Sequence, residues 1–210
     1  GFNAIVGLKP RRQQDIIERM KIAANAGVVA FTIDLDSAGR AARATKGQTV
    51  EPKTPEQLRE LVKASPLPLF FKGILTTDEA LLCLNAGAAG IVVSNHGGRV
   101  LADEPGTAEV LPAIADAIHG RCMILVDGCV KRGTDVEKYI ALGADACLAG
   151  RHFVRGAHGA LADGVELFAN TIRNELAVAM TLTGAAKVKD INRKMIRMTT
   201  PPPLAFGVPA

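Results

Sequence analysis

Residues 127–135 read Asp-Gly-Cys-Val-Lys-Arg-Gly-Thr-Asp, and this stretch decides which fold the sequence predicts. It follows an apolar run at residues 122–126 that is typical of a buried strand, and it leads into a helical pattern at residues 134–142. Glycines in such a turn let the backbone approach an anion, while the amides at the helix N-terminus point toward it. The stretch therefore predicts a βα turn that binds phosphate.

The same strand-and-helix unit recurs along the chain. Short apolar runs alternate with helical patterns, and Gly27, Gly87 and Gly143 are placed to end three of the helices. A polar loop is expected at residues 36–53. We expect strands at residues 4–7, 28–33, 67–71, 90–93, 122–126 and 146–149, and helices at residues 11–26, 55–64, 76–87, 107–118 and 134–142.

This alternation requires parallel strands joined by crossover helices, in either an open doubly wound sheet or a closed barrel. The first βα turn has no G-x-G-x-x-G, and polar residues follow several strands instead of meeting in one crevice. Both observations favour an α/β fold of the TIM (β/α)₈ type. About six units are visible where that barrel has eight, so the first two βα units are predicted to be missing.

The domain organisation follows from this count. Residues 1–198 are expected to form one barrel domain that is incomplete at its N-terminus, and residues 199–210 a Pro-rich tail. Six strands would leave open edges and exposed apolar surface. Three explanations stay open: the chain is a fragment, another polypeptide supplies the missing strands, or a second copy of the chain compensates in a homo-oligomer.

Composition excludes several classes of function. The net charge is +4, but the Lys and Arg residues are scattered among carboxylates, so no nucleic-acid partner is expected. The four cysteines have no C-x-x-C pair and no His at metal-ligand spacing, which predicts free thiols and no metal site. No apolar run is long enough to span a membrane, and no signal peptide is evident, so a cytoplasmic location is expected.

Candidate functional residues follow the predicted strands. His96 lies in the run Ser-Asn-His-Gly-Gly-Arg at residues 94–99, where an imidazole can accept a proton and Arg99 can grip a carboxylate by two hydrogen bonds. Lys72 follows an apolar run and can stabilise developing negative charge. Asp34 can orient an imidazolium or cap a turn, and Gly150 and Arg151 can add to the phosphate site.

Together these motifs resemble the FMN-dependent 2-hydroxy-acid oxidases and dehydrogenases, including glycolate and lactate oxidases. The resemblance rests on the order of four stretches along nearly the whole chain, at residues 71–74, 94–99, 127–135 and 150–151. The run at residues 105–112, Pro-Gly-Thr-Ala-Glu-Val-Leu-Pro, is also shared with bacterial members. Of these stretches, residues 94–99 form the most specific motif, because related phosphate-binding barrels share the turn at residues 127–135.

The resemblance implies FMN as cofactor and a small 2-hydroxy acid as substrate, oxidised to a 2-keto acid. It implies that His96 takes a substrate proton, that Arg99 holds the substrate carboxylate and that Asp34 supports the charged His96. Lys72 would face the flavin N1 and C2 carbonyl. Further contacts are implied for Thr32 and Ser94 with the flavin ring, Asp127 with the ribityl chain, and Gly128, Lys131, Gly150 and Arg151 with the phosphate.

The chain departs from the family pattern at several positions. Cys129 replaces a glycine, Lys131 replaces an arginine, and His152 stands where proline is usual. Ala102 stands where the family has Asp, although Asp103 is adjacent, and no Tyr is evident near the first strand. Two alternatives to a hydroxy-acid oxidase stay open: another phosphate-binding barrel enzyme, such as an FMN-using isomerase or a nucleotide dehydrogenase, and a non-catalytic FMN-binding fragment.

Overall fold

The computed structural model describes residues 3–39 and 50–199, in which six parallel strands form one sheet. Each strand pairs with the next one along the chain, in the order β1-β2-β3-β4-β5-β6. Of the predicted Pro-rich tail, only residue 199 is described. The strands are β1 (Ile5–Leu8), β2 (Ala30–Asp34), β3 (Leu69–Ile74), β4 (Gly90–Val93), β5 (Met123–Val126) and β6 (Ala146–Cys147).

The strand order decides between the two predicted architectures. A doubly wound sheet reverses its strand order at a switch point, whereas a barrel adds each strand beside the last. The observed order has no reversal, so the protein is a parallel α/β half-barrel of six strands. Within the described residues β1 pairs only with β2 and β6 only with β5, which leaves the sheet open at both ends.

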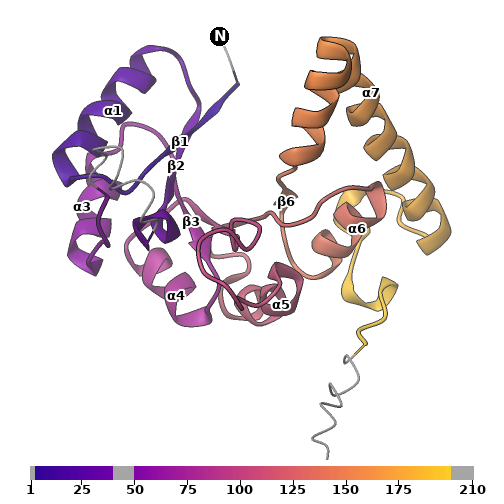
Figure 1. Ribbon diagram of the computed structural model, residues 1–210. Helices are drawn as coiled ribbons and strands as arrows, with labels where there is room; N and C mark the ends of the chain where they lie inside the picture. Colours follow the sequence, from indigo (N-terminus) through magenta and orange to yellow (C-terminus); the bar gives the residue numbers. More distant parts are fainter. Residues whose placement is uncertain (1–2, 40–49, 200–210) are drawn as a thin grey trace, which may run out of the picture.

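Helices cover the convex side of the sheet. Figure 1 shows them following an arc outside the strands, with α7 standing at the far end of the arc. Threonine side chains cap two of them: Thr54 accepts a hydrogen bond from the amide of Gln57, and Thr76 accepts one from Glu79. The helices of the arc are α1 (Gln13–Asn25), α3 (Pro55–Ala64), α4 (Thr77–Asn85), α5 (Thr107–Ile118) and α6 (Gly133–Ala141).

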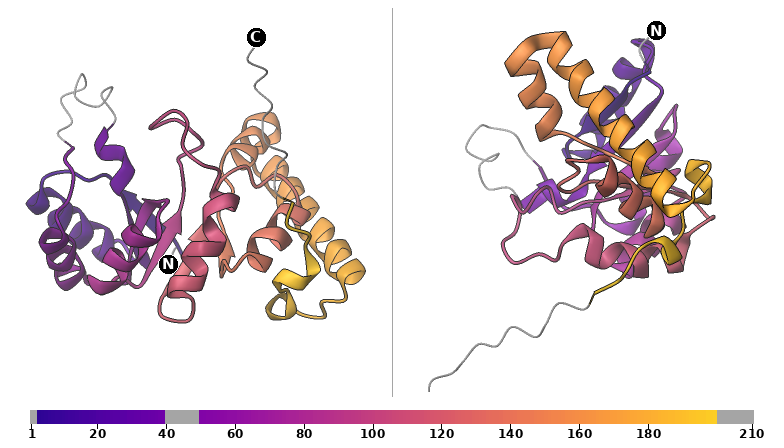
Figure 2. Two further views of the ribbon diagram at one scale, coloured as in Figure 1. Left: turned by 90° about the horizontal axis from the view of Figure 1, so that it is seen from below. Right: turned by 90° about the vertical axis from the view of Figure 1, so that its right-hand side faces the viewer.

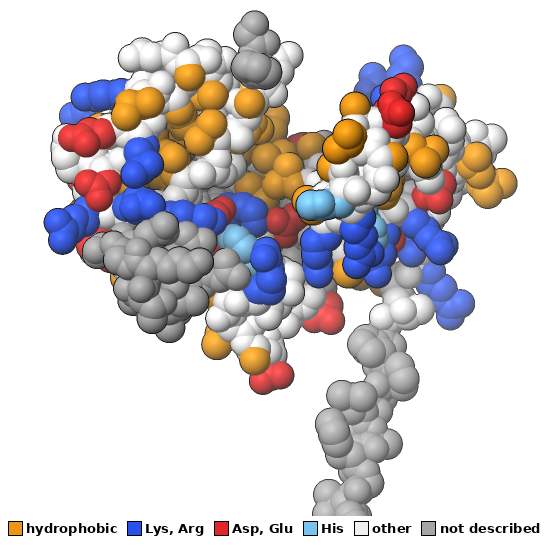
Figure 3. Space-filling view, turned by 45° about the horizontal axis from the view of Figure 1, so that its top comes forward, with side chains coloured by type: hydrophobic (Ala, Val, Ile, Leu, Met, Phe, Trp, Pro, Cys, Tyr) orange, Lys and Arg blue, Asp and Glu red, His pale blue; other side chains and the backbone are white. Residues whose placement is uncertain are grey.

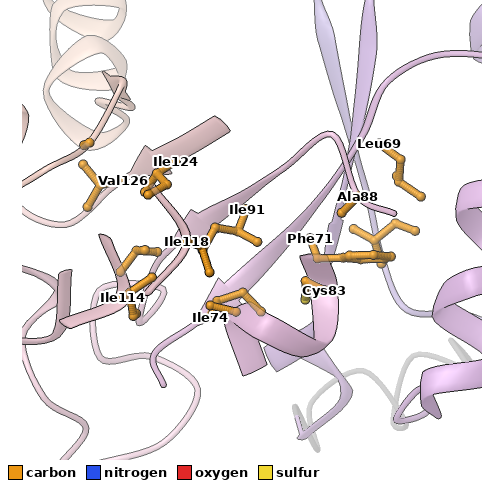
Figure 4. Close-up of a cluster of buried hydrophobic side chains, with 14 of the residues drawn as sticks. Leu69, Phe71, Ile74, Cys83, Ala88, Ile91, Ile114, Ile118, Ile124 and Val126 are labelled. Atoms are coloured by element: carbon orange, nitrogen blue, oxygen red, sulfur yellow. The ribbon is translucent and has the colours of Figure 1, made fainter. Parts of the chain in front are cut away.

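Two apolar layers follow from the alternation of side chains along each strand. The outer layer fills the space between strands and helices, and Figure 4 shows side chains of β3, β4 and β5 meeting those of α4 and α5. The inner layer lies on the concave face and is smaller. It consists of Ala30, Phe70, Val92 and Leu125, with Leu148 packed against them.

The inner layer has a direct consequence for function. Further along each strand, two or four residues after these apolar positions, the side chains on the same concave face are polar. Since all strands are parallel, these polar groups gather at the carboxyl ends of the strands, which is the end where barrel enzymes hold their active sites. The polar continuation of the inner layer comprises Thr32, Asp34, Lys72, Ser94 and Asp127.

Three elements differ from the sequence prediction. β3 runs to Ile74, because Gly73 takes a φ of +92° and produces a register shift against β4 instead of ending the strand. Asp36, predicted as the start of a polar loop, lies in the 3₁₀ helix η1 (Leu35–Gly39). Residues 40–49 of that loop lie outside the described part of the chain. β6 has only two residues, and among the described residues it pairs with β5 alone.

The long helix α7 (Arg151–Thr183) is bent sharply back on itself. Ala160 and Leu161 have non-helical backbone angles, and the two arms meet where Gly156 contacts Gly164. A Cβ on Gly156 would lie 2.5 Å from the carbonyl oxygen of Gly164, so only glycine permits this approach. Figure 2 shows α1 and α7 at opposite sides of the molecule. The chain continues through η2 (Val188–Asp190) and η3 (Arg193–Met195).

None of the helices within residues 3–39 and 50–199 is long and apolar enough to cross a membrane.

Candidate functional site

The centre of the site is a polar network that joins β3, β4 and β5. The ammonium of Lys72 donates a 2.5 Å hydrogen bond to the hydroxyl of Ser94 and lies 2.8 Å from a carboxylate oxygen of Asp127. Ser94 is buried, and the side chains of Lys72 and Asp127 are largely shielded from solvent. The ammonium is therefore held at the mouth of the half-barrel, as the sequence predicted for residues that follow neighbouring strands.

The turn after β4 holds His96 and Arg99 in fixed positions. His96, Gly97 and Gly98 all have positive φ, between 52° and 69°, so the backbone turns through three left-handed residues in succession. The turn is tied down by Ser94, whose hydroxyl accepts a 3.1 Å hydrogen bond from the amide of His96. Asn95 adds two more bonds, since its side-chain and backbone oxygens accept from the amides of Gly97 and Gly98.

Arg99 folds back over the same turn. Its Nε donates a 2.8 Å hydrogen bond to the carbonyl oxygen of His96, and Arg99 is one of the residues that line the cavity described below. A guanidinium held in this way can form a two-point contact with a carboxylate. The structure thus places His96 and Arg99, both predicted from residues 94–99, in the lining of one cavity.

His96 lies between two carboxylates from the end of β2. Its Nδ1 is 2.5 Å from Oδ2 of Asp36, and its Nε2 is 3.7 Å from Oδ2 of Asp34. All three side chains are about nine-tenths buried. Asp34, which the sequence analysis assigned to this histidine, is also paired with Lys9. Asp36 was missed because it was placed in a loop, although an Asp two residues past a strand end is a recognisable signal.

The turn at residues 127–135 is held from behind by Tyr139 and Thr107. The phenol of Tyr139 donates a 2.7 Å hydrogen bond to the carbonyl of Gly128, and the hydroxyl of Thr107 donates one of the same length to the carbonyl of Asp127. The two hydroxyls also lie 2.9 Å apart. Burial raises the pKa of Tyr139, so its phenol stays protonated as a donor. Neither residue stood out in the sequence.

The structure corrects one part of the predicted phosphate cradle. The amides at the start of α6 are already used: those of Lys131 and Arg132 donate to Asp135, and that of Gly133 donates to Glu175 of α7. They are therefore not free to hold an anion. The sequence could not reveal this, because Glu175 lies 42 residues further along the chain and reaches Gly133 only through the docking of α7.

The N-terminus of α7 offers the free backbone amides that the start of α6 lacks. α7 starts at Gly150 with no side-chain cap, and its first-turn amides have no partner in the described part of the chain. Arg151 stands in the first turn, and the absence of a Cβ at Gly150 leaves open space beside it. This end of α7 has the donor geometry that an anion requires.

These elements surround one cavity of about 360 Å³ at the carboxyl ends of the strands. Figure 3 shows Lys, Arg and His side chains gathered along the hollow between the sheet and α7. Among the described residues, Arg99, Lys131, Arg151 and Arg155 have no carboxylate within ion-pair distance. The lining comprises Lys72, His96, Gly97, Arg99, Asp127, Gly128, Cys129, Val130, Lys131, Leu148, Gly150, Arg151, His152 and Arg155.

The cavity gathers most of the predicted site residues. Eight of them line it, and they come from four separate strand ends. Thr32, Asp34 and Ser94 do not line it; they are buried on the concave face behind the lining residues. Arg155, one helical turn after Arg151, is an additional cation that sequence reasoning missed, because a single Arg on a long helix carries no distinguishing pattern.

Three of the departures from the family pattern, at Cys129, Lys131 and His152, line this cavity. Cys129 lies exposed at a φ of 57°, a conformation that glycine adopts more readily. His152 lines the cavity, and its ring stacks on Phe168 with centroids 5.6 Å apart. Lys131 keeps a positive charge where the family has an arginine. The cavity therefore remains cationic and open at the altered positions.

Comparison with known proteins assigns the family. The sequence profile of FMN-dependent dehydrogenases matches residues 9–198. The chain belongs to this family. An FMN-using isomerase or a nucleotide dehydrogenase, the first alternative from the sequence, is thereby set aside. Membership confirms the resemblance inferred from the motifs at residues 71–74, 94–99, 127–135 and 150–151.

Individual relatives are consistent with this assignment. The chain is 42% identical over 154 residues to an L-lactate oxidase of Lactobacillus jensenii, covering 73% of this chain and 37% of that protein. It is 43% identical over 142 residues to a peroxisomal (S)-2-hydroxyacid oxidase of Arabidopsis thaliana, covering 68% and 38%. A crystal structure of mandelate oxidase superposes with a TM-score of 0.81 at 34% identity, covering 89% of this chain and 61% of that one.

The chain thus spans less than two-fifths of the length of these two oxidases.

The donors around the cavity fit the phosphate end of an FMN. A phosphate monoester needs cations and amide donors without competing carboxylates, and Arg151, Lys131 and the start of α7 meet that need. Lys72 adds a further cation to the same lining. Within the described residues no group of three or more His, Cys, Asp or Glu side chains could hold a metal ion.

Proposed function

We propose that the chain provides the FMN-binding and substrate-binding side of an enzyme that oxidises a small 2-hydroxy acid to a 2-keto acid. One observation carries the proposal. A single cavity is lined by a buried imidazole, an adjacent guanidinium and a strand-end ammonium, with an anion-binding helix N-terminus beside them. This combination suits an anionic substrate and a phosphorylated cofactor held side by side.

In this proposal the cofactor lies along the strand ends. Arg151, Lys131 and the amides near Gly150 hold the phosphate, and Asp127 contacts the ribityl chain. Gly128 keeps the turn open, because a Cβ there would lie 2.5 Å from the hydroxyl of Thr107. Lys72 stabilises negative charge on the flavin ring, near Thr32 and Ser94. FMN, when bound, supplies the acceptor for the two electrons that the hydroxy acid loses.

The chain's own residues handle the substrate. Arg99 holds the carboxylate of the 2-hydroxy acid, and the imidazole of His96 accepts the proton that the substrate releases. The carboxylates beside His96 stabilise the imidazolium that forms. The buried side chains of Phe70 and Leu125 form part of an apolar layer on the same face of the sheet.

Anaerobic bleaching of the flavin tests the proposal. The chain loaded with FMN is mixed with a panel of 2-hydroxy acids and followed by visible absorbance. His96→Gln should slow bleaching by about 10²- to 10⁴-fold with flavin still bound. Arg99→Lys keeps a charge but loses the planar fork, so substrate affinity should fall together with the rate. His119→Gln, at the end of α5 and outside the cavity, is the control and should bleach like the parent.

A second candidate function is FMN binding without catalysis. It is favoured by the open ends of the sheet, since β1 and β6 each have a partner strand on one side only among the described residues. The same experiment distinguishes the two functions. FMN that binds but never bleaches with any 2-hydroxy acid supports the non-catalytic candidate and contradicts the enzymatic one.

The open sheet also supports association with further strands. We propose that the half-barrel lacks the first two βα units of the family barrel. Its edges are then covered by a second copy of the chain or by a polypeptide that supplies those units. Exposed apolar side chains on α7, among them Leu161 and Leu167, add to the uncovered surface. A monodisperse monomer in light scattering, with a single cooperative unfolding transition, would contradict this part.

The free cysteines bear on the cellular location of the protein. We propose a cytoplasmic location, supported by four cysteines that are all free. Fractionation of cells that express the chain, with a cytosolic marker enzyme as reference, tests this.

A further inference from the structure

The two nitrogens of His96 have different surroundings. Nδ1 lies within hydrogen-bond distance of Asp36, at 2.5 Å. Nε2 lies 3.7 Å from Asp34, which is beyond the range of a hydrogen bond, and Asp34 already has a partner in Lys9. The histidine is therefore bonded to Asp36, although Asp34 is the residue that matches the family motif.

The backbone is built so that Asp36 can reach the histidine. η1 turns the chain directly after β2 and points the Asp36 side chain toward β3, where Gly73 takes a φ of +92°. A Cβ on Gly73 would lie 2.4 Å from Cγ of Asp36. The space that any other residue would fill at position 73 is thus occupied by the Asp36 carboxylate.

The chemistry of the pair fixes the state of the imidazole. An ionised carboxylate can only accept hydrogen bonds, so the proton of this short contact belongs to Nδ1. A neutral imidazole with its proton on Nδ1 has its lone pair on Nε2. Nε2 makes no hydrogen bond within the described part of the chain, so it is available as a base.

We propose that Asp36 is the positioning residue of His96. It holds the Nδ1–H tautomer, leaves Nε2 to take the substrate proton, and stabilises the imidazolium afterwards. This inference rests on the proposed oxidation of a 2-hydroxy acid. In that reaction the hydroxyl proton passes to Nε2, while the hydride equivalents leave the substrate carbon for the acceptor that FMN supplies.

The surroundings of Asp36 agree with this role. The half-buried carboxyl of Glu104 belongs to the same cluster; burial first, and then the charge of Asp36, raise its pKa. One oxygen of each of these two carboxyls is buried without a hydrogen-bond partner in the described residues. Among residues 3–39 and 50–199, His96 is the one donor that reaches the Asp36 side chain.

Nitrogen-detected NMR of the uniformly ¹⁵N-labelled chain without cofactor tests the tautomer directly. The His96 signals are assigned by their loss in His96→Gln. At neutral pH the parent should show the Nδ1–H tautomer. Asp36→Asn, which has nearly the same shape, should lose this preference, because an amide that can also donate replaces a carboxylate that can only accept. Asp34→Asn is the matched variant and should keep the Nδ1–H tautomer.

A kinetic readout on the FMN-loaded chain completes the test. Asp36→Asn should slow flavin bleaching by about 10- to 100-fold and bind FMN as tightly as the parent. A parental tautomer in Asp36→Asn, with a changed tautomer in Asp34→Asn, would overturn the inference. Should no 2-hydroxy acid bleach the parent, the proposed oxidation fails, while the tautomer measurement still decides on Asp36.

Discussion

The ammonium of Lys72 donates its 2.5 Å hydrogen bond to the hydroxyl of Ser94, and this contact links the carboxyl ends of β3 and β4 directly beneath the cavity. Asp127 holds the same ammonium from β5 at 2.8 Å. Three neighbouring strands therefore fix one positive charge. In the proposed enzyme that charge stabilises the reduced flavin.

Replacing Lys72 by Met tests this role. Met has a similar length but no charge, so the midpoint potential of the bound flavin should fall and bleaching by a 2-hydroxy acid should slow by about 10²-fold. The potential is measured by redox titration with a reference dye. Lys63→Met, on the outer helix α3, is the control and should leave the potential unchanged. An unchanged potential in Lys72→Met shows that the ammonium does not face the flavin.

The phosphate site makes a prediction about affinity. Arg151→Gln removes a cation next to the first-turn amides of α7, and losing one charge-assisted contact should weaken FMN binding by about 10- to 100-fold. Fluorescence titration of FMN measures the change. Arg173→Gln, on the distal arm of the same helix and bonded only to Asn170, is the control. Equal affinities for Arg151→Gln and the parent would place the phosphate elsewhere.

The hydrogen bonds by which Tyr139 and Thr107 hold the turn at residues 127–135 make a prediction about stability. Tyr139→Phe removes the donor to the carbonyl of Gly128 and one neighbour of the buried Thr107 hydroxyl, which keeps its bond to Asp127, and this should lower the free energy of unfolding by about 1–3 kcal/mol. Urea unfolding measures it. Thr107→Val should cost less once Tyr139 is already Phe, because both hydroxyls belong to one network. Strictly additive losses would mean that the two hydroxyls act independently.

Much of the fold could be read from the sequence because it rests on local signals. Gly27 lies directly after the end of α1 as predicted, and the capping threonines Thr54 and Thr76 likewise act within a few residues. Part of the site could also be predicted, because parallel strands bring the residues at their carboxyl ends to the same edge of the sheet. Lys72, Ser94 and Asp127 meet there regardless of the loop conformations. Family membership then confirmed the family resemblance that the order of the motifs indicated.

What could not be predicted depends on contacts between distant segments. Glu175 takes the amide of Gly133 only because the bent α7 packs onto α6, and the bend depends on the contact between Gly156 and Gly164. Asp36 reaches His96 across 60 positions through the space left by Gly73. No local pattern in either segment encodes these approaches.

Cys129 provides the last prediction, because its exposure sets it apart from the other thiols. Burial raises the pKa of Cys83 and of Cys147 to about 12, and it also raises that of Cys122. At pH 8 a thiol of pKa 12 is ionised in about one molecule in ten thousand, against about a quarter for an ordinary thiol. A thiol reagent at pH 8 should therefore modify Cys129 first, and the buried thiols only after urea unfolds the chain.

Because Cys129 lines the cavity, the same reaction reports on the phosphate site. Saturating FMN should slow the modification of Cys129 by at least about tenfold, since a bound phosphate covers the turn, and Arg151→Gln should need more FMN for the same protection. Cys129→Ser, which removes the fast phase, confirms the assignment by mass spectrometry of the modified peptide. If FMN binds to the parent but leaves Cys129 fully reactive, its phosphate does not lie at the turn of residues 127–135, and the departure from glycine at position 129 has moved the cofactor.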